Sequence, residues 1–115
     1  MTSAELKNEI VNIMRDKLAG DITIVDIAKQ TVVADYFVIA TGKSATQVRA
    51  ISDTIEEKLE QQGIFVERKE GIREGRWVVL DYLNIIVHIF NGETRDFYGL
   101  EKLWSTGTNV TKIED

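Results

Sequence analysis

Two β-rich runs, Trp77 to Tyr82 and Ile85 to Phe90, are separated in this chain by only two residues, Leu83-Asn84. Both runs are dominated by β-branched and aromatic side chains, which favour extended backbone. A two-residue connection between such runs leaves room only for a tight reversal. The segment therefore predicts an antiparallel β-hairpin.

The register of this hairpin gives its two faces different characters. A two-residue loop sets Tyr82 opposite Ile85, and the face that carries this pair is almost wholly apolar, which marks it as the core face. The other face mixes large aromatic rings with two ionisable groups, so it is either half covered or a binding surface. The remaining core-face pairs are Leu80 with Val87 and Val78 with Ile89, and the open face presents Trp77, Val79, Asp81, Ile86, His88 and Phe90.

Two helices are predicted from capping boxes that precede apolar residues at helical intervals. The first box, Thr2-Ser3-Ala4-Glu5, opens a helix over about 3–19 that ends at Gly20. The second box, Ser44-Ala45-Thr46-Gln47, opens a helix that closes at Gly63.

Strands are predicted over 22–27 and 36–40, with a further short strand over 64–67 and a polar loop over 70–75. The strand over 36–40 leads through a glycine turn into the second helix. A strand, a short turn and a capped helix make half of an α/β unit. The fold class expected is α/β.

The C-terminal part is predicted as one helix over 94–104, with Phe97, Leu100, Leu103 and Trp104 forming a single apolar stripe. Residues from Ser105 onward are polar and are expected to fray. At 115 residues and 43% hydrophobic content, the chain can bury one ordinary core. We therefore expect a single domain over 1–104 and a polar tail over 105–115.

The composition of the chain excludes several classes of functional site. The chain has no cysteine, which excludes disulfides, thiolate metal sites and thiol nucleophiles. Its formal net charge of −5 opposes the phosphate neutralisation that direct nucleic-acid binding requires. The N-terminus lacks the pattern of a signal peptide and no apolar run is long enough to span a membrane, so a cytoplasmic location is expected.

Three features of the sequence have both a chemical and a structural interpretation. Gly42-Lys43-Ser44 ends like a phosphate loop, but Phe37 stands where the first glycine is needed, so a turn and N-cap explain it better. A nucleotidyltransferase needs two carboxylates one residue apart on a strand, and neither strong strand has them. His88 and Asp81 lie diagonally across the hairpin, and a structural hydrogen bond between them is favoured over a catalytic role.

Four segments together resemble the RsfS/Iojap family of ribosomal silencing factors. They are DYFVIATG from Asp35, WVVLDY from Trp77, IIVHIF from Ile85 and RDFYGLEKLW from Arg95, and the resemblance runs from about Leu6 to Trp104. It implies a mixed β-sheet flanked by helices, like a catalytically inactive nucleotidyltransferase fold. It also implies a protein that binds large-subunit ribosomal protein fourteen, blocks subunit joining and forms a homodimer when free.

The sequence departs from that family at the hairpin tip, where Leu83-Asn84 replaces the usual Gly-Asp or Gly-Asn. Since leucine disfavours positive φ, a different turn type could slip the register and exchange the faces.

The expected function is steric silencing of translation, without catalysis, metal or cofactor. Trp77 and Phe90 are expected to be apolar anchors, unless a helix of the same domain covers them. The charge partners expected are Asp81 and Glu70, and the polar contacts expected are Tyr82, His88 and Tyr98. The alternatives are a nucleotide-binding enzyme and a dimeric scaffold that acts away from the ribosome.

Overall fold

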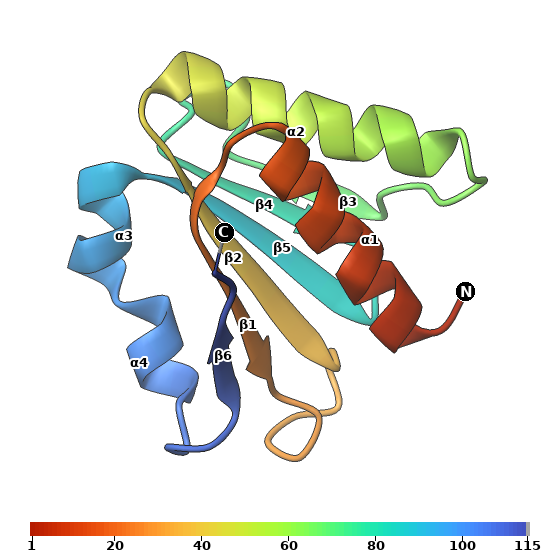
Figure 1. The fold of residues 1–115 in the computed structure, drawn as a ribbon, viewed down its shortest axis with the longest axis vertical. Helices are drawn as coiled ribbons and strands as arrows, with labels where there is room; N and C mark the ends of the chain where they lie inside the picture. Colours follow the sequence, from red (N-terminus) through yellow and green to blue (C-terminus); the bar gives the residue numbers. More distant parts are fainter. Residues whose placement is uncertain (115) are drawn as a thin grey trace.

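The computed structural model describes residues 1–114, and its centre is one six-stranded sheet with helices on both faces (Figure 1). The strand order is β3-β4-β5-β2-β1-β6. Only β2 and β5 run parallel, and every other neighbouring pair is antiparallel. The predicted mixed α/β sheet is confirmed. In chain order the elements are α1 (Ser3–Asp16), β1 (Gly20–Asp26), β2 (Tyr36–Gly42), α2 (Ala45–Glu60), β3 (Arg68–Glu70), β4 (Trp77–Asp81), β5 (Ile85–Asn91), α3 (Gly92–Tyr98), α4 (Leu100–Trp104) and β6 (Val110–Lys112).

Both predicted N-caps are present. The Thr2 hydroxyl accepts a hydrogen bond from the Glu5 backbone N–H, and the Glu5 carboxylate accepts one from the Thr2 N–H. Ser44 caps α2 by accepting from the Gln47 N–H at 3.1 Å. The Gln47 side chain turns back one residue further than a standard box, to the Lys43 N–H. The N-cap interpretation of Gly42-Lys43-Ser44 is therefore confirmed.

Each face of the sheet has its own apolar cluster. The larger lies under α1 and α2 and includes the predicted core face of the hairpin, with Val78, Leu80, Val87 and Ile89 fully buried. The smaller lies under α3 and α4, which Figure 1 shows away from α1 and α2. Its buried members are Val25, Ile27, Ala34, Phe37, Ile39 and Phe90, with Trp77, Ile86, Leu100, Trp104 and Val110 partly buried against them.

The hairpin keeps the predicted register in spite of its leucine tip. Val78 pairs with Ile89 and Leu80 with Val87, as predicted. Leu83 takes a φ of 72°, and the Asn84 N–H donates to the Tyr82 carbonyl oxygen at 3.0 Å. A hydrogen bond across one residue with positive φ is the strained form of a γ-turn. The apolar pattern of both strands therefore fixes the register, and the turn absorbs the strain.

Four local predictions were wrong. The first helix ends at Asp16, and Gly20 begins a strand instead of ending the helix. The short strand lies at Arg68–Glu70, not at 64–67. The single helix over 94–104 is two helices, because Gly99 takes a left-handed φ of 55° between them.

The predicted fraying tail is the fourth correction. Residues Val110–Lys112 form β6, which pairs antiparallel with β1 through Thr23, Ile24 and Val25. The Asn109 side chain also donates to the backbone carbonyls of Asp26 and Trp104. Asp115, the last residue of that tail, lies outside the described residues.

Candidate functional site

The face of the sheet that lies under α3 and α4, which we call the second face, is covered over only part of its width. Helix α3 contacts β5 and β2, and α4 contacts β1, whereas β3 and β4 lie farther toward the edge. On this uncovered part Val79, Asp81 and Ile86 are half-buried, and all three residues of β3 are exposed. The predicted open face is thus open along β3 and β4 and at Ile86 near the start of β5, and it is closed over the rest of β5.

An aromatic ladder crosses the border between the covered and open parts. Trp77 stacks on Phe90, with ring centroids 4.9 Å apart and planes inclined by 25°. Tyr98, from α3, packs against Trp77 at 4.6 Å, and Phe97 meets Tyr98 edge-on at 5.2 Å. Exposure rises along the ladder, from 0% at Phe90 to 47% at Tyr98 and 82% at Phe97. We call Trp77, Phe97 and Tyr98 the aromatic surface.

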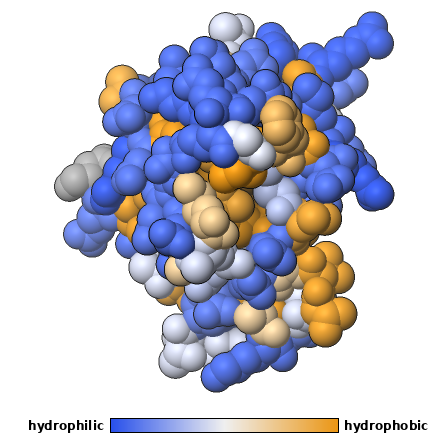
Figure 2. Space-filling model, turned by 90° about the vertical axis from the view of Figure 1, so that its right-hand side faces the viewer, coloured by the Kyte–Doolittle hydropathy of each residue, from blue (hydrophilic) through white to orange (hydrophobic). Residues whose placement is uncertain are grey.

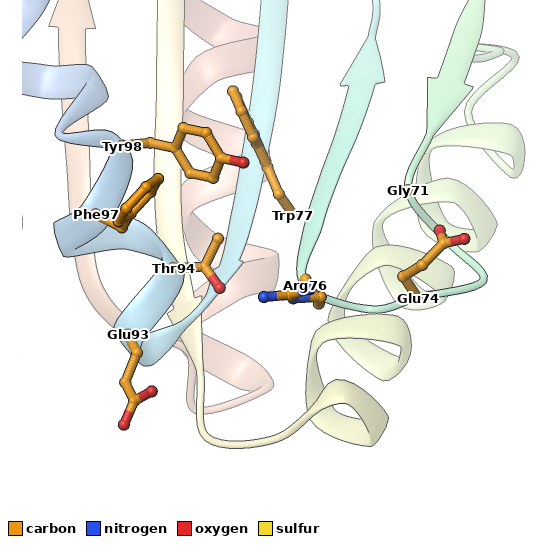
Figure 3. A pocket seen from close by; sticks show the side chains of 8 residues that line it. All are labelled: Gly71, Glu74, Arg76, Trp77, Glu93, Thr94, Phe97 and Tyr98. Atoms are coloured by element: carbon orange, nitrogen blue, oxygen red, sulfur yellow. The ribbon is translucent and has the colours of Figure 1, made fainter.

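A shallow cavity of about 470 Å³ adjoins the aromatic surface (Figure 3). One wall is the turn before β4, with Gly71, Glu74 and Arg76, and the other is α3, with Glu93 and Thr94. In Figure 3 the rings of Trp77 and Tyr98 lie next to each other, tilted, in the upper part of the site. The site therefore combines aromatic rings with charged groups of both signs.

Gly71 shapes one wall of that cavity. Its φ is +80°, and a Cβ atom there would lie 1.9 Å from the Trp77 carbonyl oxygen. No side chain fits at that distance, so glycine is the only residue that lets the turn pass this close to β4.

His88 lies beneath the aromatic surface and not on it. Its Nδ1 accepts a hydrogen bond from the Trp77 indole Nε1–H at 3.1 Å, and the Phe37 ring packs edge-on against it at 4.8 Å. Burial lowers the pKa of His88 from 6.5 to about 4, because a charged imidazole would lose its hydration. At neutral pH the ring is therefore uncharged and able to accept.

Asp81 does not pair with His88, so that prediction was wrong. The Asp81 carboxylate accepts from the Leu83 backbone N–H at 2.8 Å and thereby supports the hairpin turn. The cross-strand partner of His88 is Val79, and the hydrogen-bonding partner of its side chain is Trp77.

The seven residues predicted to contact a partner fall into two groups. Glu70, Trp77, Asp81 and Tyr98 lie on the open side of the second face or at its rim. Phe90 and His88 lie on the same face but are buried beneath α3 and the aromatic ladder, so the expectation that they are exposed was wrong.

Tyr82 is the third buried member of the predicted set. Its side chain belongs to the cluster under α1 and α2, on the opposite face from Trp77. Burial, with added repulsion from Glu56 and Glu60, raises the pKa of its phenol well above the usual value. Tyr82 is therefore a core residue and not a surface contact.

The sequence prediction missed Phe97 as a surface residue. Its spacing placed it in a core stripe with Leu100 and Leu103, but Phe97 and Leu103 are exposed and only Leu100 and Trp104 pack inward. Gly99 in the interior of the expected helix was the available signal, because glycine in a left-handed conformation commonly ends a helix.

No group of three or more histidine, cysteine, aspartate or glutamate residues within 1–114 is placed to hold a metal ion. Among the helices in that same stretch, none is long and apolar enough to cross a membrane.

Figure 2 shows a face that is mostly hydrophilic, with hydrophobic atoms concentrated toward its lower right.

Comparison with known proteins gives one consistent family. The family described as "Ribosomal silencing factor during starvation" matches residues 1–115. The ribosomal silencing factor RsfS of Halalkalibacterium halodurans is 36% identical over 96% of this chain and 94% of its own length. The mouse "Mitochondrial assembly of ribosomal large subunit protein 1" is 28% identical over 84% of this chain and 43% of its own length.

A solved structure supports the same fold. A crystal structure of a protein from Chromobacterium violaceum superposes with a TM-score of 0.88 at 31% identity, and the match covers 90% of this chain and 87% of that one.

Proposed function

Because this chain belongs to the RsfS family of ribosomal silencing factors, we propose that it represses translation by binding large-subunit ribosomal protein fourteen. In this mechanism the bound protein occupies space that the small subunit needs, so the two subunits do not join. No bond is made or broken, and the protein acts without catalysis or cofactor.

The aromatic surface is the observation that carries this proposal. Three rings, Trp77, Phe97 and Tyr98, meet beside a cavity on a sheet face that α3 and α4 leave partly open. Aromatic residues are enriched in the buried centres of protein interfaces, where a few of them supply most of the binding free energy. The large-subunit assignment is supported by the name of the mouse relative, which refers to assembly of that subunit.

Charge at the rim favours a basic partner. Glu74 and Glu93 line the cavity with one basic residue, Arg76. On the adjoining open face, Glu70 and Asp81 lie with one basic residue, Arg68. The chain as a whole carries a formal charge of −5. Opposite charges speed association and orient the partner, whereas the aromatic contacts hold the complex together. A basic ribosomal protein fits this arrangement.

The nucleotidyltransferase alternative makes a different prediction. The family resemblance includes a likeness to an inactive nucleotidyltransferase fold, and we propose that the likeness is one of fold only. A nucleotide that bound the folded protein with magnesium would raise its melting temperature. We expect no change in melting temperature with millimolar ATP and magnesium, and a clear rise would favour the enzyme.

We also propose that the free protein is a cytoplasmic homodimer. Exposed apolar side chains such as Phe97 favour self-association at high concentration. Sedimentation equilibrium across a range of concentrations tests this part independently of ribosome binding, and a monomer throughout would reject it.

The main test is co-sedimentation with isolated large and small ribosomal subunits. The wild-type protein is expected to sediment with the large subunit alone. Trp77→Ala and Phe97→Ala are each expected to weaken that binding by about 30-fold, corresponding to about 2 kcal/mol at an interface centre.

Leu103→Ala is the matched control, because Leu103 is similarly exposed but lies on α4 outside the cavity. It should bind like the wild type. Binding to neither subunit would reject the ribosomal function, and equal losses in all three variants would reject the aromatic surface as its site.

A further inference from the structure

The orientation of Trp77 is fixed by one directional contact. Stacking on Phe90 and packing against Tyr98 hold the plane of the indole, but dispersion contacts of this kind are weakly directional. The hydrogen bond from Nε1–H to His88 Nδ1, at 3.1 Å, is the contact that selects which edge of the indole points inward.

The hairpin register makes this contact possible. Trp77 pairs with Phe90 and Val79 pairs with His88, so His88 lies diagonally across from Trp77 on the same face. The Phe37 ring, from the neighbouring strand β2, packs edge-on against the imidazole at 4.8 Å. His88 is therefore held by the core while its Nδ1 is directed at the indole.

The chemistry of this imidazole suits an acceptor. Since Nδ1 accepts, the single proton of the neutral ring is on Nε2. That Nε2 is buried and, within the part of the chain that the structure describes, has no hydrogen-bonding partner. A buried donor without a partner lowers stability, and a phenylalanine would fill the same space without that cost. The histidine is thus better explained by the bond it accepts than by packing.

We propose that His88 is a positioning residue of the aromatic surface: it holds the Trp77 indole in the orientation that the partner recognises and does not touch the partner itself. This inference rests on the function proposed above. It also replaces the earlier expectation that His88 makes a polar contact to the ribosome.

The expected effect on affinity follows from the population of the correct rotamer. Without the hydrogen bond, the stacked Trp77 indole can turn over about χ2 within the same plane, so that either of its two edges can point inward. The apparent dissociation constant rises by the inverse of the fraction that remains competent. With two accessible orientations, binding to the large subunit is expected to weaken by about 2-fold, far less than when the indole is removed.

Two substitutions separate the acceptor from the ring. His88→Phe keeps an aromatic ring and removes the acceptor, whereas His88→Asn keeps an acceptor close to the position of Nδ1. If His88→Phe does not fold, His88→Leu serves as the variant without an acceptor. The first readout needs no ribosome: it is the indole N–H signal of Trp77 in a ¹H–¹⁵N spectrum, with its rate of hydrogen exchange.

The two indole signals are assigned from the one that Trp77→Phe removes, and Trp104 provides the internal reference. We expect His88→Phe to shift the Trp77 indole signal and to speed its exchange about 10-fold, since the loss of one net hydrogen bond is worth about that factor. His88→Asn should restore slower exchange and tighter large-subunit binding together.

The outcomes distinguish this inference from the proposed function. An unchanged Trp77 indole signal in His88→Phe would overturn the positioning role, and so would a changed signal with unchanged large-subunit affinity. If Trp77→Ala itself binds normally, the aromatic surface is not the ribosome site, and the positioning role falls with it even though the indole signal still reports the bond.

Discussion

Replacing Leu83 with glycine should stabilise the protein, although it removes a side chain. Leu83 forms the hairpin tip with a φ of 72°, and a left-handed conformation costs a residue with a Cβ atom roughly 1–2 kcal/mol. Glycine relieves that strain, but it lowers the stability by about 0.4–1 kcal/mol because it gives the unfolded chain more conformational freedom. The Leu83 side chain is 57% exposed, so little packing is lost. The net gain expected is roughly 0.5–1 kcal/mol.

Urea denaturation followed by far-ultraviolet circular dichroism measures this gain as a higher midpoint. Leu83→Ala is the matched control at the same site, because alanine also loses the exposed side chain but keeps the Cβ atom and hence the strain. We expect the glycine variant to be more stable than the alanine variant by about 1 kcal/mol.

A second control reverses the order. Leu103 is also exposed but is helical, in α4. At this position the Leu103→Gly variant should be less stable than the Leu103→Ala variant, by about 1 kcal/mol. If the Leu83→Ala variant is as stable as the Leu83→Gly variant or more stable, the turn is not strained and the reasoning from the φ of Leu83 is refuted.

Three further predictions concern buried features. Gly71→Ala should destabilise by at least about 2 kcal/mol, seen as a lower thermal midpoint, because its Cβ atom would lie 1.9 Å from the Trp77 carbonyl oxygen. Arg95→Met should lower the free energy of unfolding, measured by urea denaturation, by about 3 kcal/mol, because the half-buried Glu101 carboxylate, 3.1 Å from Arg95, would lose its partner. Adding Glu101→Gln should recover part of this loss. The pKa of His88 is about 4 in the folded protein and 6.5 in the unfolded chain, so the unfolded chain binds the proton at a higher pH. The free energy of unfolding should therefore fall by about 3 kcal/mol as the pH drops from 6.5 to 4. His88→Phe should lack that share of the pH dependence, and an identical pH profile in both proteins would contradict it.

The sequence predicted best what short-range patterns determine. The hairpin register, both N-caps and the core face of β4 and β5 follow from residues close together in the chain. Even the unfavourable Leu83 did not shift the register, because a slip by one residue would expose Val78 and Leu80 and bury Asp81. The cost of that exchange exceeds the strain of one turn residue.

What the sequence did not predict depends on distant partners. The strand at Val110–Lys112 is polar and short, and it is stabilised by pairing with β1, more than eighty residues earlier. The burial of His88 and Phe90 depends on where α3 lies, and its position follows from Arg95, whose guanidinium donates to the hydroxyls of Thr23 and Thr41. Neither contact leaves a periodic signal in the chain.

The open part of the second face follows from the same anchoring. Arg95 fixes the start of the α3–α4 segment over β1 and β2, and Leu100 and Trp104 continue it along that side of the sheet. Gly99 turns the chain between the two helices, so α3 ends with Phe97 and Tyr98 beside Trp77 instead of covering β4.

Trp77 therefore lies where the core ends and the open face begins. Its inner side is held by Phe90 and His88, and its outer side faces Tyr98 and the cavity. An aromatic ring already fixed in the free protein loses little rotamer freedom on binding, which leaves more of its contact energy available for affinity. The arrangement that makes this face a partial core is thus also what makes its border suited to rigid docking.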